Sequence, residues 1–281
     1  MKARLLSLLA VAATTVATAQ PLHLTKALDL VHDLTALQAA GIFTDSAGVS
    51  LNRYGGSWGS ASDPSYVHFT DLAAGTAPAN NTRCAPLLTH LLKDLHGRDW
   101  RQFAFTDPLT NTVKTSASPA PYQYIALTKA GQGLVRIPRL ADAEPGDLLH
   151  WWQVGTADSD HSMIIVAIDW ASAKAYPSDH SQADPALAGT TYYEVRVVDS
   201  SASVHTNDSR LVTVNGSTVQ IPGIGTGTIG LLVNTDGELV AYTWSLPTSD
   251  YVTKRTGWLS GLHTRLRRLP AYEAVISRYQ P

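Results

Sequence analysis

The sequence predicts an α+β fold in which helices come first and an antiparallel sheet follows. A helix-like stretch over residues 24–40 and a second one beginning at Cys84 precede several strand-like segments between residues 148 and 244. The pair Asp236-Gly237 between the last two segments is typical of a β-hairpin. We therefore expect one domain in which a helix packs on a central antiparallel sheet.

The first 19 residues have the layout of a secretory signal peptide. A basic start through Arg4 is followed by an uncharged apolar run over residues 5–16 and by Ala17-Thr18-Ala19, which matches a cleavage site. The run is shorter than the roughly 20 apolar residues that a membrane span requires. We expect an exported protein, periplasmic or extracellular, with no membrane span. Residues 20–281 are expected to form a single domain with an N-terminal helix and a C-terminal extension.

The composition narrows the classes of partner and cofactor. Charged residues make up 16% of the 281 residues and the formal net charge is −2, which does not favour binding to nucleic acid. The histidines lack the paired spacing that metal sites show, so we expect neither a metal nor another cofactor.

The N-terminal part is expected to hold one amphipathic helix and a long irregular segment. Apolar residues recur every three or four positions over residues 24–40, and Gly41 ends the pattern. Residues 44–82 are rich in Gly, Ser, Asp and Asn, and long irregular segments in compact domains are often functional. This segment either forms a surface loop pinned by Tyr54 and Trp58 or carries these aromatic residues to the rim of a cleft.

The segment around Cys84, the only cysteine, is expected to begin the second helix. Asn81 or Thr82 is expected to cap this helix, and Pro86 fits its first turn. A stripe of leucines over residues 87–95 predicts that one face of the helix is buried. The partial positive charge at a helix N-terminus favours a thiolate, so Cys84 is either an activated nucleophile or an inert buried thiol.

The remaining expected elements are one short helix and six strands. The helix is expected over residues 122–129. The strands are expected over residues 148–154, 162–168, 192–199, 211–214, 229–233 and 239–244. The segment 162–168 is short and apolar, which favours a central position in the sheet.

Two polar residues at strand ends are candidate partners of Cys84. His161 comes directly before the predicted central strand, where its imidazole can pair with a thiolate and pass a proton to a leaving group. Asp199 ends the next strand, and its carboxylate can orient the His161 ring if the two strands are neighbours. Asp160 is a rival for this role, but its side chain should point elsewhere because it adjoins His161 in sequence.

The order of these features resembles the NlpC/P60 and CHAP branch of the papain-like fold. The features are Cys84 at a helix N-terminus, a Pro-Gly-Asp turn at residues 145–147 that leads into a strand, His161 before the next strand, and a polar residue on the strand after that. The resemblance covers about residues 80–200.

The resemblance implies a secreted cysteine peptidase or amidase that cuts peptide bonds in bacterial cell walls, so the expected partner is a peptide or cell-wall substrate. It implies Cys84 as the nucleophile, His161 as the general base and Asp199 as the residue that orients His161. The backbone N–H of Cys84 would contribute to an oxyanion hole, with Asn81 and Tyr54 as candidate side-chain donors. The alternative is a catalytically silent binding or structural protein of the cell envelope on the same fold.

Three further patterns carry less information. Residues 225–230 match G-x-G-x-x-G, but a strand follows instead of a helix, so we expect a glycine-rich loop beside the sheet or cleft and no dinucleotide site. Trp151 and Trp152 alternate along one strand, and we expect one in the core and Trp152 in the cleft. Residues 253–281 are rich in Lys and Arg, which fits contact with an anionic envelope polymer or simply a solvated face.

Overall fold

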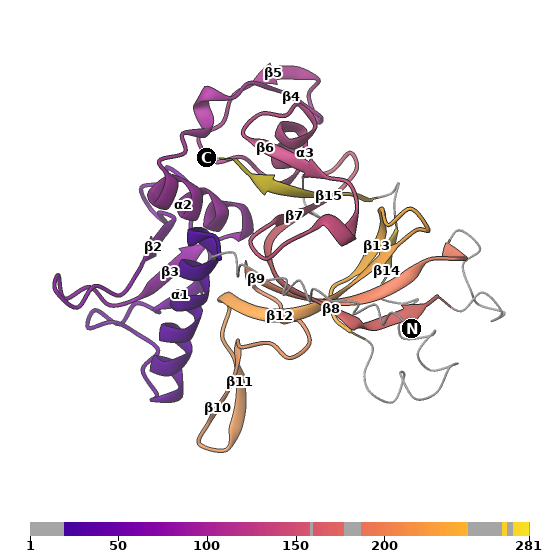
Figure 1. Ribbon diagram of the computed structural model, residues 1–281. Helices are drawn as coiled ribbons and strands as arrows, with labels where there is room; N and C mark the ends of the chain where they lie inside the picture. The colour runs from indigo at the N-terminus through magenta and orange to yellow at the C-terminus, as the bar shows by residue number, and fades with distance from the viewer. Residues whose placement is uncertain (1–19, 158–159, 177–186, 247–265, 269–271, 281) are drawn as a thin grey trace, which may run out of the picture.

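An antiparallel sheet of eight strands forms the centre of the molecule (Figure 1). The computed structural model describes residues 20–157, 160–176, 187–246, 266–268 and 272–280. The predicted signal peptide and Lys254, Arg255 and Arg265 of the basic segment lie outside these described residues. Among the described residues, no helix combines the length and the apolar character that crossing a bilayer demands.

Three α-helices cover one face of the sheet. They are α1 (Leu22–Ala39), α2 (Cys84–His96) and α3 (Pro121–Lys129). Leucines of α1 and α2 and Tyr124 of α3 share one hydrophobic core with Leu148, Ile164 and Val198 of the sheet. Burial of this apolar surface is what holds the helices on the sheet. Two short 3₁₀ helices, Trp100–Gln102 and Leu140–Asp142, lie in the connections.

The order of the strands in the large sheet is β14-β13-β12-β9-β8-β7-β15-β6, and every neighbouring pair is antiparallel. The strands are β6 (Leu134–Ile137), β7 (Leu148–Gln153), β8 (Asp160–Ala175), β9 (Thr191–Ser201), β12 (Gly223–Val233), β13 (Leu239–Thr243), β14 (Leu266–Arg268) and β15 (Tyr272–Tyr279). The predicted central strand corresponds to β8, which lies between β7 and β9. This adjacency brings the start of β8 next to the end of β9.

The C-terminal strand β15 lies inside the sheet, between β7 and β6. The part of the chain that we expected to be an extension therefore completes the sheet. Arg278 on β15 forms ion pairs with Asp147 at 2.8 Å and with Glu144 at 3.2 Å. Arg278 is thus engaged within the fold, and it is not a free cation on a solvated face.

The irregular segment 44–82 contains a small sheet of its own, in the order β1-β3-β2. Its strands are β1 (Asn52–Tyr54), β2 (Tyr66–His68) and β3 (Ala79–Thr82). The parallel pairing of β1 with β3 places Tyr54 opposite Thr82, two residues before Cys84. The segment therefore brings Tyr54 to the start of α2.

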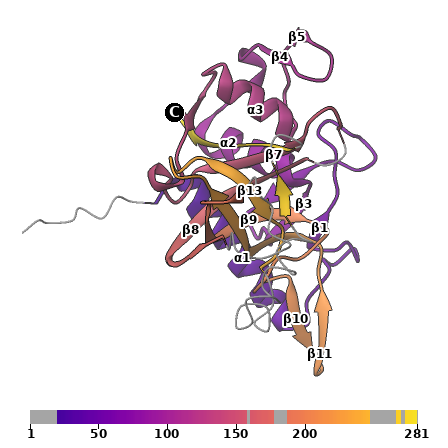
Figure 2. The same ribbon diagram turned by 90° about the vertical axis from the view of Figure 1, so that its right-hand side faces the viewer.

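Two further hairpins lie outside these two sheets in the described residues. The first is formed by β4 (Phe105–Asp107) and β5 (Thr112–Lys114), and the second by β10 (Leu211–Val214) and β11 (Ser217–Gln220). The β10–β11 hairpin extends away from the large sheet in both views (Figures 1 and 2).

The glycine-rich motif lies within strand β12, so our expectation of a loop was wrong. The glycines serve close packing instead. A Cβ atom added to Gly225 would lie 2.6 Å from Cγ of Arg210, and one added to Gly227 would lie 2.5 Å from Cβ of His205. Such distances exclude a side chain, so β12 must present bare backbone to the segment that carries His205 and Arg210.

Candidate active site

Cys84 is the first residue of α2. The preceding residue, Arg83, is extended (φ −85°, ψ 175°), and no side chain caps this helix end within the described part of the chain. Our expectation that Asn81 or Thr82 caps α2 was wrong, because β3 pairs with strands on both edges and stays extended through Thr82. The partial positive charge of the uncapped helix N-terminus therefore lies at Cys84.

A hydrogen bond between β9 and β3 fixes Cys84 relative to the sheet. Ser200 Oγ donates to the Thr82 carbonyl oxygen at 2.6 Å, and both residues are buried. Ser200 directly follows Asp199, and Thr82 lies two residues before Cys84. Cys84 and Asp199 are thus held near each other through their neighbours in the chain.

His161, at the start of β8, contacts both of its predicted partners. Its Nε2 lies 2.6 Å from Oδ2 of Asp199, and its ring lies close enough to Cys84 for that side chain to raise the pKa of His161. Because Nε2 faces Asp199, Nδ1 is the nitrogen left to face Cys84. The three residues therefore form one connected series, in the order that the sequence suggests.

The charges around His161 favour its protonated form. Burial by itself lowers the pKa of His161, but the negative charges of Cys84 and Asp199 and the hydrogen bonds with them outweigh burial and raise the pKa to about 10. The ring is accordingly an imidazolium at neutral pH, which is the partner that a thiolate nucleophile requires.

The carboxylate of Asp199 is fully buried and remains ionised. Burial raises its pKa, but the positive charges of His205 and Arg210 and hydrogen bonds from His161 and His205 hold the pKa far below its usual range. Asp199 supplies the carboxylate that bonds His161, while Asp160 lines the cavities beside the pair.

Two cavities flank the Cys84–His161 pair. The cavity on the Cys84 side has a volume of about 500 Å³, and its wall includes Trp58, Arg83, Cys84 and Tyr122. The cavity on the His161 side has a volume of about 360 Å³, and its wall includes Trp151, His161, Tyr242, Trp244 and Tyr272. We call these the Cys84 cavity and the aromatic cavity. Tyr54 and Asp160 line both, so the two cavities meet beside Cys84 and His161.

Tyr54 retains its candidate role because it lines the Cys84 cavity together with Cys84. Burial and the negative charge of Cys84 raise the pKa of the Tyr54 hydroxyl above its usual value. The hydroxyl therefore stays protonated and can donate a hydrogen bond at neutral pH. A protonated phenol next to the nucleophile can stabilise an oxyanion.

Asn81 is not an oxyanion donor, contrary to our expectation. Its Nδ2 already donates to Oδ1 of Asp63 and to the carbonyl oxygen of Pro64, both at 2.9 Å. Asn81 is also fully buried in β3. Its amide holds residues 63–64 of the irregular segment in place, and this partnership has no signature in the sequence.

Trp152 is not a cleft residue, which corrects a further expectation. It packs against Ile125 and Val275 under α3, and its indole N–H donates to the carbonyl oxygen of Thr156. Trp151 takes the cleft position instead, because β7 pairs Trp151 directly with His161. Alternation along the strand predicts that the two indoles separate but not which of them faces the cleft.

His205 and Arg210 belong to the site and were not found from the sequence. His205 Nε2 lies 3.0 Å from Asp199 Oδ2, and Arg210 Nη2 lies 3.1 Å from Asp199 Oδ1. Both side chains are buried. They come from the irregular connection between β9 and β10, and the only hint of their approach was the run of glycines in β12.

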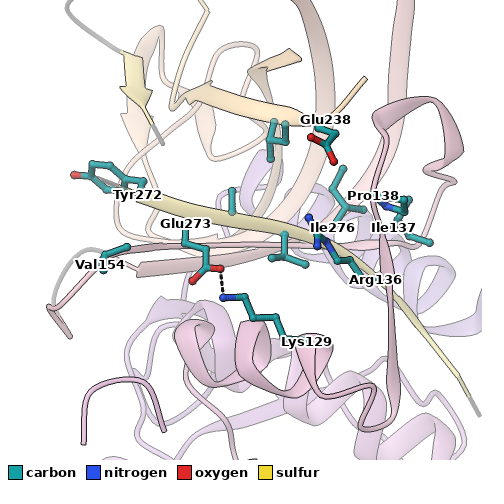
Figure 3. A pocket seen from close by; sticks show the side chains of 12 residues that line it. Lys129, Arg136, Ile137, Pro138, Val154, Glu238, Tyr272, Glu273 and Ile276 are labelled. Atoms are coloured by element: carbon teal, nitrogen blue, oxygen red, sulfur yellow. Dashed lines mark ion pairs between the residues drawn. The ribbon is translucent and has the colours of Figure 1, made fainter. Parts of the chain in front are cut away.

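A separate cavity of about 360 Å³ is lined mainly by residues of β15 and β6, with Lys129 from the end of α3 in its wall (Figure 3). Glu273 of β15 forms an ion pair with Lys129 of α3 there. The wall shares Tyr272 with the aromatic cavity but includes neither Cys84 nor His161. In the described portions of the chain, no three His, Cys, Asp or Glu side chains are grouped so as to hold a metal ion.

Comparison of the chain with protein-family models, with curated proteins and with solved structures gives no match. Function is therefore inferred from the side chains of the site.

Proposed function

We propose that this protein is a cysteine hydrolase that cleaves an amide bond, with Cys84 as nucleophile, His161 as acid and base, and Asp199 as the residue that orients His161. The observation that carries the proposal is the connected series of Cys84, His161 and Asp199 at the N-terminus of α2. An inert core cysteine needs no ionised partners, whereas a nucleophilic cysteine needs a histidine held in place by a third group.

The proposed reaction proceeds through an acyl-enzyme. The Cys84 thiolate attacks the carbonyl carbon, and the oxyanion that forms accepts hydrogen bonds from N–H groups at the start of α2 and from the Tyr54 hydroxyl. His161 gives its proton to the leaving nitrogen, the C–N bond breaks and a thioester remains. His161 then takes a proton from water, the water attacks the thioester, and the C–S bond breaks to release a carboxylic acid.

The two cavities suggest how the substrate lies. His161 must reach the leaving nitrogen, so the amine side of the substrate occupies the aromatic cavity next to His161. The acyl side then occupies the Cys84 cavity, where Arg83 in the wall favours an anionic group. An exported hydrolase with this arrangement suits a peptide substrate, and in line with the resemblance we propose peptide of the bacterial cell wall.

A catalytically silent envelope protein is the alternative, and the reactivity of the thiol separates the two. Iodoacetamide should label Cys84 of the folded protein rapidly at about pH 6, because an ion-paired thiolate persists below the usual range of a free thiol. His161→Gln should slow this labelling by at least about tenfold. Labelling that requires a denaturant would contradict the proposed chemistry.

The substrate requires its own assay. Purified bacterial cell wall is digested with wild-type protein and with Cys84→Ala, and newly formed amine ends are counted. We expect new amine ends only with the wild type. Equal counts, together with rapid labelling of Cys84, would exclude this substrate while leaving the reaction class intact.

A further inference from the structure

His205 contacts the same carboxylate oxygen as His161. Its Nε2 lies 3.0 Å from Asp199 Oδ2, the atom that His161 Nε2 approaches to 2.6 Å. The other ring nitrogen of His205, Nδ1, lies 2.7 Å from the carbonyl oxygen of Trp244. The His205 side chain is completely buried. Two histidines therefore share one carboxylate at the centre of the site.

These contacts define the charge of His205. A carbonyl oxygen only accepts hydrogen bonds, so Nδ1 must donate to Trp244. An ionised carboxylate also only accepts, so Nε2 must donate to Asp199. Donation from both nitrogens makes His205 an imidazolium.

The surrounding charges balance when His205 is protonated. Arg210 bonds Asp208 through two nitrogens, at 2.8 and 2.6 Å, and also pairs with Asp199. Two carboxylates thus face Arg210 and His205, and the four buried groups together carry no net charge. A neutral His205 would leave one buried negative charge uncompensated, which is costly in a protein interior.

The fold holds this group rigidly. The main-chain N–H of His205 donates to Oδ2 of Asp208 at 2.6 Å, and the bare backbone at Gly225 and Gly227 lies directly against Arg210 and His205. The Trp244 ring packs on both His161 and His205, with ring centroids 4.9 and 4.2 Å apart. Neither histidine can turn away from Asp199 without displacing Trp244.

We propose that His205 is a positioning residue of the active site, which as an imidazolium shares Asp199 with His161 and, together with Arg210, holds that carboxylate oriented for catalysis. The role in catalysis rests on the proposed cysteine hydrolase function. The groups that face His205 are the Asp199 carboxylate, the His161 ring on the same carboxylate oxygen, the Trp244 carbonyl and ring, and the Asp208–Arg210 pair on its own segment. His205 also places its positive charge on the carboxylate oxygen that His161 bonds.

The protonation state can be measured on the wild-type protein, whether or not it turns over a substrate. Nitrogen NMR of ¹⁵N-histidine-labelled protein at about pH 7 distinguishes an imidazolium from either neutral tautomer. We expect both nitrogens of His205 to carry protons, and the signals are assigned by their loss in His205→Gln. A neutral His205 would overturn the proposal, whereas denaturant-dependent labelling of Cys84 in the same protein would overturn only the proposed hydrolase.

The catalytic role is tested by the pH profile of Cys84 alkylation. His205→Gln removes the positive charge but keeps an N–H donor. The rising limb of the alkylation rate against pH should therefore move to higher pH by about one unit, and alkylation at about pH 6 should fall about tenfold. His150→Gln, which alters another buried histidine of the sheet, is the matched control and should leave the profile in place. A uniform loss at every pH, or no change, would show that His205 is only structural.

Discussion

Two buried histidines on paired strands show how the same side chain acquires opposite charge states. His150 on β7 lies between the hydroxyls of Ser162 and Ser277, at 2.8 and 3.3 Å, and stacks on Tyr124. Burial lowers its pKa to about 3, so it stays neutral. His161 is equally enclosed, yet its negative partners raise its pKa to about 10.

The difference lies in which face of the sheet each histidine occupies. His150 pairs with Ser162, and the next pair along the two strands is Trp151 with His161. Successive residues of a strand point to opposite faces, so His150 faces the core beneath the helices and His161 faces the carboxylate of Asp199. Burial alone removes the charge of a histidine, and only a fixed counter-charge restores it.

The largest expected effect comes from replacing His161, the charged histidine of the two. His161→Gln should lower the rate of amide hydrolysis by at least about ten-thousandfold, because the proposed acid that protonates the leaving nitrogen is removed. His150→Gln should keep the rate within a few-fold of wild type. Hydrolysis of a substrate identified from the cell-wall digest measures both. Comparable losses in the two variants would mean that His161 is another structural histidine.

Asp199→Asn should reduce hydrolysis by roughly a thousand- to ten-thousandfold, because the His161 ring loses its orienting charge. The pKa of His161 is raised by its negative partners, so its imidazolium persists as pH rises and is lost only near pH 10. Removing the charge of Asp199 should move the falling limb of kcat/KM against pH to lower pH. An unmoved limb would show that Asp199 does not set the charge of His161.

Tyr54→Phe should lower kcat by about a hundred- to a thousandfold, which is the usual effect of losing one oxyanion donor. KM should change little, since the hydroxyl acts on charge that develops during the reaction. Steady-state kinetics of the two proteins measures this. A change confined to KM would assign Tyr54 to substrate binding instead.

Tyr272→Ala should raise KM by about three- to tenfold for a substrate with an aromatic residue on its amine side, because one ring of the aromatic cavity is lost. A matched substrate with glycine at that position should respond less. If both substrates respond equally, the amine side does not occupy the aromatic cavity.

The smallest expected effect is on the stability of the folded protein, and it tests whether His150 is buried as a neutral ring. His150 binds a proton in the unfolded state near its usual pKa but in the folded state only at about pH 3. Stability should therefore fall as pH drops below about 6.5, and the fall should be shallower in His150→Gln. Chemical denaturation at about pH 6 and pH 4.5 measures the difference, and parallel behaviour of the two proteins would mean that His150 is not buried as a neutral ring.

The sequence alone predicted the site residues that lie at the start of a helix or on strands consecutive in the chain. Cys84 begins a leucine-striped helix, and His161 and Asp199 lie on neighbouring strands whose antiparallel pairing brings these two side chains together. The sequence could not predict which of Trp151 and Trp152 faces the cleft, because alternation shows that they point to opposite faces of the strand but not which face is which.

The remaining parts depend on long-range packing that carries no local pattern. His205 and Arg210 reach Asp199 only because glycines of β12, a later strand, leave room for them. The amide of Asn81 is occupied by a residue of an irregular segment. The insertion of β15 between β7 and β6 likewise joins strands that are far apart in sequence.

The central claim is that Cys84 and His161 form an ion pair, and the ultraviolet absorbance of the thiolate measures it directly. Difference spectra between wild type and Cys84→Ala isolate the signal of the single cysteine across the pH range. We predict a thiolate signal already at about pH 6 in the folded wild type, and its displacement to higher pH in His161→Gln. Absence of the signal below about pH 8 in the wild type would contradict the account.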